Sequence, residues 1–84
     1  MPSDERQRFY SDYWKRAGFV YSPANAIARK WAELAEANQW LGQPTEPEHQ
    51  TENGQYIMQA FAAGVLYCKM GDWGNVLQGL PPFS

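Results

Sequence analysis

Three glutamates in the middle of the chain are the first candidates for acid–base chemistry. Glu46, Glu48 and Glu52 all fall in the segment 44–53. Glycosidases need a pair of carboxyl groups, one of which donates a proton. The donor must also lie in an apolar pocket that raises its pKa. Because the whole segment is polar, it favours a solvated loop over a hydrolytic site.

A cysteine and a histidine are the other residues that could react. The sequence has one cysteine, Cys68, and one histidine, His49. A thiolate–imidazole pair would need a third group to orient the histidine and a site for an oxyanion. Cys68 falls in a segment that we expect to be a strand, where a free thiol packs as a small apolar group. A single histidine and cysteine also give no metal-ligand cluster. We therefore predict no enzyme, no metal and no cofactor.

Aromatic side chains beside polar ones suggest a different chemistry, the binding of a sugar. Rings stack on sugar faces, and carboxylates or amides bond the hydroxyls. Trp73 lies between Asp72 and Gly74 in a polar turn, which favours an exposed ring that anchors a ligand. For Trp40 and Tyr56, burial in the core is favoured over a place in such a site. The candidate glycan-binding residues are Trp40, Tyr67, Trp73, Glu48 and Asp72, with Tyr56 and Gln59 as further members.

The N-terminal segment offers a surface for a protein partner. A helix is expected over residues 4–17, and four aromatic residues fall on one of its faces. Packing of that stripe on the rest of the domain is favoured, and the alternative is a helix that docks on another protein or a second copy of the chain. The candidate partner-binding residues are Phe9, Tyr10, Tyr13 and Trp73.

Helices are expected in the first half of the chain. The first ends before Gly18, a residue suited to a left-handed helix end. The second is expected over residues 23–37, because Ser22-Pro23 is a strong helix start and Asn38 suits a left-handed stop. Its apolar face carries Ile27, Trp31 and Leu34, which should cover one face of a sheet. Its charged residues, Arg29, Lys30, Glu33 and Glu36, are read as a solvated face.

Strands are expected in the second half. Gly42 suggests a backbone position with positive φ, the run 47–53 reads as a loop, and Asn53-Gly54 reads as a tight turn. Residues 55–61 and 65–68 read as a hairpin around the three residues 62–64. A third short strand is possible at residues 75–77.

Length and composition set the class of the protein. The chain has 84 residues, enough for one small domain, and 44% of them are hydrophobic. The net charge is −2 with scattered basic residues, which argues against nucleic-acid binding. No apolar run approaches the ~18 residues of a membrane span, and no secretory signal is recognised. A single cysteine fits a reducing compartment, so we expect a cytoplasmic location.

The segment from about residue 26 to 79 resembles the LGFP-repeat family. Leu41-Gly42-Gln43-Pro44-Thr45 with Glu48 looks like its signature turn, although Gln43 stands where an aromatic residue is typical. The resembling helix residues are Ile27, Lys30-Trp31 and Leu34, and the resembling hairpin residues are Gly54, Tyr56, Phe61, Gly64 and Leu66-Tyr67. The resemblance implies a non-enzymatic module that binds or anchors to cell-wall glycan. The family usually occurs as tandem repeats in secreted bacterial proteins, whereas this sequence has one copy.

The sequence thus predicts one α+β domain over residues 1–84, with an N-terminal helix (1–18) and an LGFP-like module (19–84). Two helices should precede a small antiparallel sheet of two or three strands. We expect non-catalytic binding, with protein–protein interaction or a homodimer as the first reading, as in a phage or bacterial regulatory or inhibitor protein. Binding to cell-wall glycan or the cell envelope is the alternative.

Overall fold

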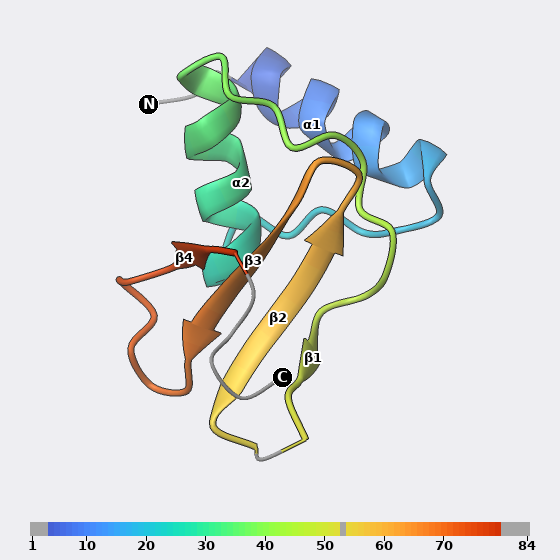
Figure 1. Ribbon diagram of the computed structural model, residues 1–84. Coiled ribbons are helices and arrows are strands. Elements are labelled where there is room, and N and C mark those ends of the chain that lie inside the picture. The colour runs from blue at the N-terminus through green and yellow to red at the C-terminus, as the bar shows by residue number, and fades with distance from the viewer. Residues whose placement is uncertain (1–3, 53, 80–84) are drawn as a thin grey trace.

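The computed structural model describes residues 4–52 and 54–79, and in that part of the chain two helices precede a four-stranded sheet (Figure 1). The elements are α1 (Asp4–Arg16), α2 (Ala26–Glu36), β1 (His49–Gln50), β2 (Tyr56–Phe61), β3 (Gly64–Lys69) and β4 (Leu77–Gln78). All neighbouring strands are antiparallel, in the order β1-β2-β3-β4. The predicted α+β class is confirmed. The sheet gains β1, a short strand in the run that the sequence analysis read as a loop.

Helix α1 has the charge pattern that stabilises a short helix. Asp4 and Glu5 lie in its first turn, and Lys15 and Arg16 lie in its last turn. Each sign therefore opposes the partial charge of the helix end that it occupies. Gly18 follows with a φ of +89°, and its amide donates to the carbonyl of Lys15 at 2.9 Å. The expected left-handed residue after this helix is confirmed.

Helix α2 begins later than the sequence predicted. Ser22-Pro23 forms a turn instead of a helix start, because the Asn25 amide donates to the Ser22 carbonyl at 2.9 Å. Proline at the second position of such a turn is favoured, since its φ is already fixed near the required value. The helix starts at Ala26, with Asn25 in an extended conformation before it. It stops as predicted, with Asn38 in the left-handed region at a φ of 62°.

The chain segment after α2 runs beside the tip of the β2–β3 hairpin and holds it. The amides of Ala62 and Ala63 donate to the carbonyls of Gln43 and Leu41, at 3.0 and 2.8 Å. The hairpin loop has two residues, not the three expected, because Gly64 pairs with Phe61 at the start of β3. Gly42 has the positive φ that the sequence predicted, +83°. The predicted Asn53-Gly54 turn falls partly on residue 53, which lies outside the described residues.

One aromatic core joins both helices to the hairpin. Trp31 of α2 is almost fully buried, and its indole N–H donates to the Gly42 carbonyl at 3.0 Å. The Tyr10 ring of α1 lies 5.2 Å from the Trp31 ring, and the Trp14 ring lies 5.5 Å from the Phe61 ring (centroid distances). Helix α1 is therefore part of the core. Tyr10, which the sequence analysis predicts as a partner-binding residue, is only 3% exposed.

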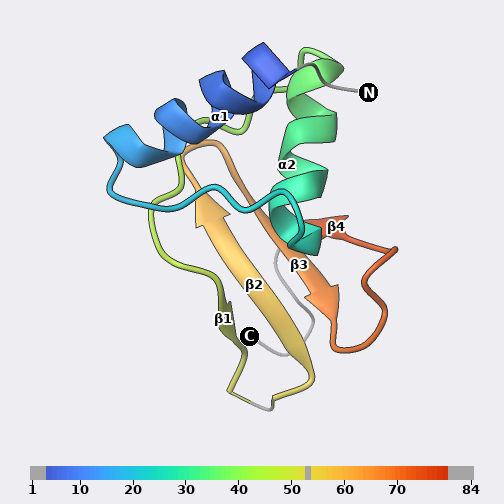
Figure 2. The ribbon, with the colours of Figure 1, turned by 180° about the vertical axis from the view of Figure 1, so that it is seen from behind.

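The two faces of the sheet differ in what covers them. Side chains alternate along a strand, and the register places one set on the face packed against α2. That face carries Ile57, Gln59, Phe61, Leu66 and Cys68. The opposite face carries Tyr56, Met58, Val65, Tyr67 and Leu77. Figure 2 shows α2 and the connector 17–25 lying in front of the first face. Among the described helices, none is both long and apolar enough to cross a membrane.

Candidate functional site

An exposed tryptophan stands at the end of α2, on the loop between β3 and β4. The Trp73 side chain is 43% exposed. Its carbonyl accepts from Arg29 Nη2 of α2 at 3.2 Å, which ties the loop to the helix. The loop is braced internally, because the Asp72 carbonyl accepts from the Cys68 Sγ at 2.9 Å and from the Asn75 amide at 3.1 Å. Trp73 is therefore exposed on a loop with defined anchors.

Trp73 borders a cleft of about 430 Å³ at the N-terminal end of α2. We call this hollow the Trp73 cleft. Its lining combines one aromatic ring, one guanidinium, one carboxylate and an amide with apolar groups: Ala24, Asn25, Ala26, Arg29, Glu48, Ile57 and Trp73. Its volume lies within the ~300–1,000 Å³ that small-molecule sites usually have.

The polar groups of the cleft can both donate and accept hydrogen bonds. Arg29 offers donors only, the Glu48 carboxylate offers acceptors, and an asparagine amide offers both. Burial raises the pKa of Glu48 above its usual value. The Asn25 side chain does not cap α2 and remains available to a ligand. A ligand bearing several hydroxyl groups matches such a lining.

Two of the sequence-predicted glycan residues line this cleft, and the others lie elsewhere. Trp73 and Glu48 meet there, and Asp72 is next to Trp73 on the loop, bonded through its carboxylate to Asn75 Nδ2 at 3.4 Å. Tyr67 lies on the opposite face of the sheet, with its ring 5.8 Å from the Tyr56 ring. Its position there follows from the strand register.

Trp40 belongs to a second surface, where α1 meets the C-terminal end of α2. Its ring lies 6.0 Å from that of Phe9, and the two residues are 41% and 53% exposed. We call these two residues the Phe9–Trp40 patch. A hollow of about 370 Å³ beside it includes Glu36, which accepts from the Tyr10 hydroxyl at 3.0 Å and pairs with Arg6. Of the predicted docking residues, Phe9 is exposed, Tyr13 is half-buried and Tyr10 is buried.

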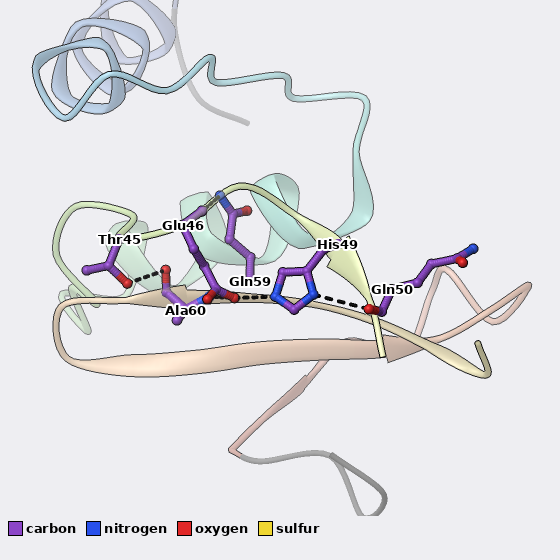
Figure 3. Close-up of polar contacts among 6 residues, drawn as sticks. All are labelled: Thr45, Glu46, His49, Gln50, Gln59 and Ala60. Atoms are coloured by element: carbon purple, nitrogen blue, oxygen red, sulfur yellow. Dashed lines mark hydrogen bonds and ion pairs between the residues drawn. The ribbon is translucent and has the colours of Figure 1, made fainter. Parts of the chain in front are cut away.

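The glutamate cluster that suggested acid–base chemistry is separated by the fold. Glu46 Oε2 lies 2.6 Å from His49 Nε2 and accepts from the Ala60 amide at 3.3 Å. Figure 3 shows the Glu46 and His49 side chains pointing toward each other along the edge of β2. The Glu46 carbonyl accepts from Gln59 Nε2 at 3.0 Å. Glu46 thus fastens the segment before β1 to β2, while Glu48 faces the Trp73 cleft.

His49 and Cys68 do not form a pair. The register pairs His49 with Met58 but Cys68 with Ile57, so the two side chains point to opposite faces of the sheet. Cys68 is fully buried, and burial, followed by the nearby Asp72 charge, raises the pKa of its thiol. Within residues 4–52 and 54–79, no group of three or more His, Cys, Asp or Glu side chains is placed to hold a metal ion.

Arg29 and Asn25 are the cleft residues that the sequence analysis missed. Arg29 was read as part of a solvated helix face, and Asn25 was placed inside α2. Neither has a local signal, because their role depends on where the β3–β4 loop docks and on where α2 begins. Comparison with protein-family models, curated proteins and solved structures gives no match. The function is therefore inferred from the geometry of the site.

Proposed function

We propose that this chain is a non-catalytic binding domain whose ligand is a glycan held in the Trp73 cleft. One observation carries the proposal: an exposed tryptophan borders a cleft that also presents a guanidinium and a carboxylate. The alternative docking surface on α1 is smaller than its aromatic stripe suggests, because Tyr10 and Trp14 of that stripe are buried in the core.

The chemistry of a sugar fits the composition of the cleft. A sugar ring has apolar C–H faces that can lie on the Trp73 indole, and its hydroxyls both donate and accept. Arg29 would donate to the hydroxyl oxygens, and Glu48 would accept from the hydroxyl hydrogens. Because Arg29 also bonds the Trp73 carbonyl, the guanidinium and the backbone that carries the ring are already held together. Such preorganisation lowers the entropic cost of binding.

The LGFP-like pattern of residues 26–79 adds the source of the glycan to the proposal. The family resemblance implies the cell wall, which makes a glycan of the bacterial envelope the ligand of first choice. The turn that carries the pattern, Leu41–Thr45, lies beside the hairpin tip and not in the cleft. In this proposal the pattern serves the fold, and the cleft residues bind the ligand.

Retention on purified, insoluble bacterial cell-wall glycan tests the proposal. Wild-type protein should be retained, and Trp73→Ala should lower the affinity at least about tenfold, as expected for a stacked aromatic anchor. Trp40→Ala is the matched control, since it removes a tryptophan of similar exposure from the other surface. Loss of retention with Trp40→Ala but not with Trp73→Ala would contradict the proposal.

The Phe9–Trp40 patch supports a second candidate, a protein–protein interaction with a partner or a second copy of the chain. Two exposed rings in edge-to-face contact, beside a hollow of about 370 Å³, are suited to anchor another protein. A cytoplasmic regulatory or inhibitor role belongs with this candidate. A partner captured by wild type and by Trp73→Ala, but lost with Phe9→Ala, would favour it over the glycan.

A further inference from the structure

A second hollow, of about 160 Å³, continues the Trp73 cleft along α2. Ala26, Arg29 and Trp73 line both hollows, so the two meet at these residues. Toward the start of α2 the cleft includes Asn25, and further along the helix the second hollow includes Glu33. The helical rise places these two positions about 12 Å apart along the helix axis. The two hollows therefore form one elongated site.

The helical side of the second hollow is a single face of α2. Ala26, Arg29, Lys30 and Glu33 are spaced at i, i+3, i+4 and i+7, which places them on one face. Lys30 is half-buried and Glu33 is exposed, and neither side chain has a hydrogen-bond or ion-pair partner among the described residues. Lys30 offers donors and Glu33 offers acceptors. This face therefore presents both kinds of polar group to a ligand.

The other side of the second hollow is the loop between β3 and β4. It is formed by Gly74, Asn75 and Val76. Open space surrounds the position that a Cβ of Gly74 would take, so the loop backbone stays accessible there. The Asn75 amide both donates and accepts, and its Nδ2 already bonds Asp72 Oδ2 at 3.4 Å. Both sides of the hollow thus carry groups that match the hydroxyls of a sugar.

Arg29 stands where the two hollows meet. A guanidinium has several N–H donors in a fixed plane. Arg29 Nη2 donates to the Trp73 carbonyl at 3.2 Å, and the other nitrogens are left to serve a ligand in either hollow. The same bond holds the loop against α2, so both walls of the second hollow are in place without a ligand.

We propose that the Trp73 cleft and the second hollow together bind a linear glycan of at least two sugar units that runs along α2. One unit lies in the Trp73 cleft, and the next contacts Lys30, Glu33 and Asn75. A single sugar ring is shorter than the span from Asn25 to Glu33, whereas two linked rings cover it. This inference rests on the proposed function, because it specifies the length of the glycan that the Trp73 cleft holds.

NMR titrations of the ¹⁵N-labelled protein test the inference. The probes are the disaccharide repeat of bacterial cell-wall glycan and, separately, the two monosaccharides that compose it. The monosaccharides should shift amide signals of the cleft, at residues 24–29 and Glu48. The disaccharide should in addition shift Lys30, Glu33 and residues 74–76 saturably. The added hydrogen bonds predict at least about tenfold tighter binding of the disaccharide than of either monosaccharide.

A pair of lysine variants isolates the second hollow. Lys30→Met removes the ammonium group and keeps an unbranched side chain of similar helix propensity. It should lower the affinity for the disaccharide about threefold to tenfold and leave the affinity for the monosaccharides unchanged. Lys15→Met is the matched control, because it removes an exposed lysine from α1, and it should change neither affinity. If Lys30→Met does not fold, the wild-type shifts at residues 74–76 still decide the matter.

The outcomes distinguish this inference from the proposed function. Equal affinities for the disaccharide and a monosaccharide, with shifts confined to the cleft, would overturn the second hollow as a sugar site and leave glycan binding intact. Retention on cell-wall glycan with no response to the disaccharide would likewise overturn only the two-unit site. If the protein neither binds these sugars nor is retained on cell-wall glycan, both proposals fall.

Discussion

At the scale of single residues, the Glu46 carboxylate has a structural role, because it connects the segment before β1 to β2. Its Oε2 contacts both His49 Nε2 and the Ala60 amide. This side chain therefore links the two segments at a point where β1 no longer pairs with β2 through the backbone. His49 adds a second contact, between its Nδ1 and the Gln50 carbonyl at 3.1 Å. Protonated histidine donates from both ring nitrogens, which suits both acceptors. The contact should therefore depend on pH.

The pH dependence has a definite sign. The Gln50 carbonyl, and then Glu46, raise the pKa of His49 above its usual value near 6.5. A raised folded-state pKa means that the contribution to stability is fully present below about pH 6.5 and is lost as the pH rises through the folded value. We expect His49→Gln to reduce the free energy of unfolding more at pH 5.5 than at pH 8.5. The difference should stay below about 1 kcal/mol, because the pair is exposed.

Urea unfolding of wild type and His49→Gln at the two pH values measures this difference. Glu52→Gln is the control, since it removes an exposed carboxylate of the same segment without touching the contact. Equal effects of His49→Gln at both pH values would show that the Glu46–His49 contact does not form in solution.

At the scale of elements, the turn at Leu41–Thr45 holds the tip of the β2–β3 hairpin through backbone hydrogen bonds. Its carbonyls accept from the Ala62 and Ala63 amides, and the Thr45 amide donates to the Ala60 carbonyl at 3.0 Å. A side chain at Gly42 would place its Cβ 2.9 Å from the Ala62 Cβ. Glycine is needed at Gly42 for two reasons, its positive φ and this close approach.

Gly42→Ala should therefore cost more than an ordinary glycine substitution. The left-handed backbone alone costs an alanine about 1–2 kcal/mol, and the overlap with Ala62 adds about 1–3 kcal/mol. Gly18→Ala is a matched control, because Gly18 has a similar φ of +89° but open space around it. Chemical denaturation should show a clearly larger loss for Gly42→Ala. Equal losses for the two variants would mean that the hairpin tip and the turn are not in contact.

The same elements show what the sequence could and could not predict. The positive φ of Gly42 and the stops at Gly18 and Asn38 were predicted, because each depends on a local backbone preference. The start of α2 was not, since Ser22-Pro23 suits both a helix start and a turn, and the structure has the turn. Strand β1 was missed because His49 and Gln50 carry no apolar alternation. Its pairing with β2 is supported by the non-local bond from Ala60 to Glu46.

At the scale of the whole molecule, aromatic rings make up much of the core, beside aliphatic residues such as Ile27, Leu41 and Leu66. Tyr10, Trp14, Tyr21, Trp31 and Phe61 form a connected set of edge-to-face contacts from α1 to the hairpin. The sequence identified these rings but could not divide them between core and surface. The proposed function rests on that division, because it leaves Trp73, Trp40 and Phe9 as the large exposed rings of the described chain.

The Cys68 thiol provides a test of how rarely the native structure opens. Its thiol is fully buried on the face covered by α2, and its raised pKa lowers the fraction of reactive thiolate. Alkylation by iodoacetamide at pH 8 should be at least about 100-fold slower in the native protein than in urea, because it requires an opening that costs several kcal/mol. Mass spectrometry follows the reaction. Comparable rates in both conditions would contradict the packing of β3 against α2.

Mapping of amide chemical shifts tests the central claim, that the Trp73 cleft is the ligand site, most directly. Soluble fragments of bacterial cell-wall glycan would be titrated into ¹⁵N-labelled protein. The account predicts saturable changes at residues 24–29, at Glu48 and at residues 72–75, with little change at Phe9 and Trp40. Changes centred on Phe9 and Trp40, with the cleft unaffected, would contradict it and make the α1 surface the functional one.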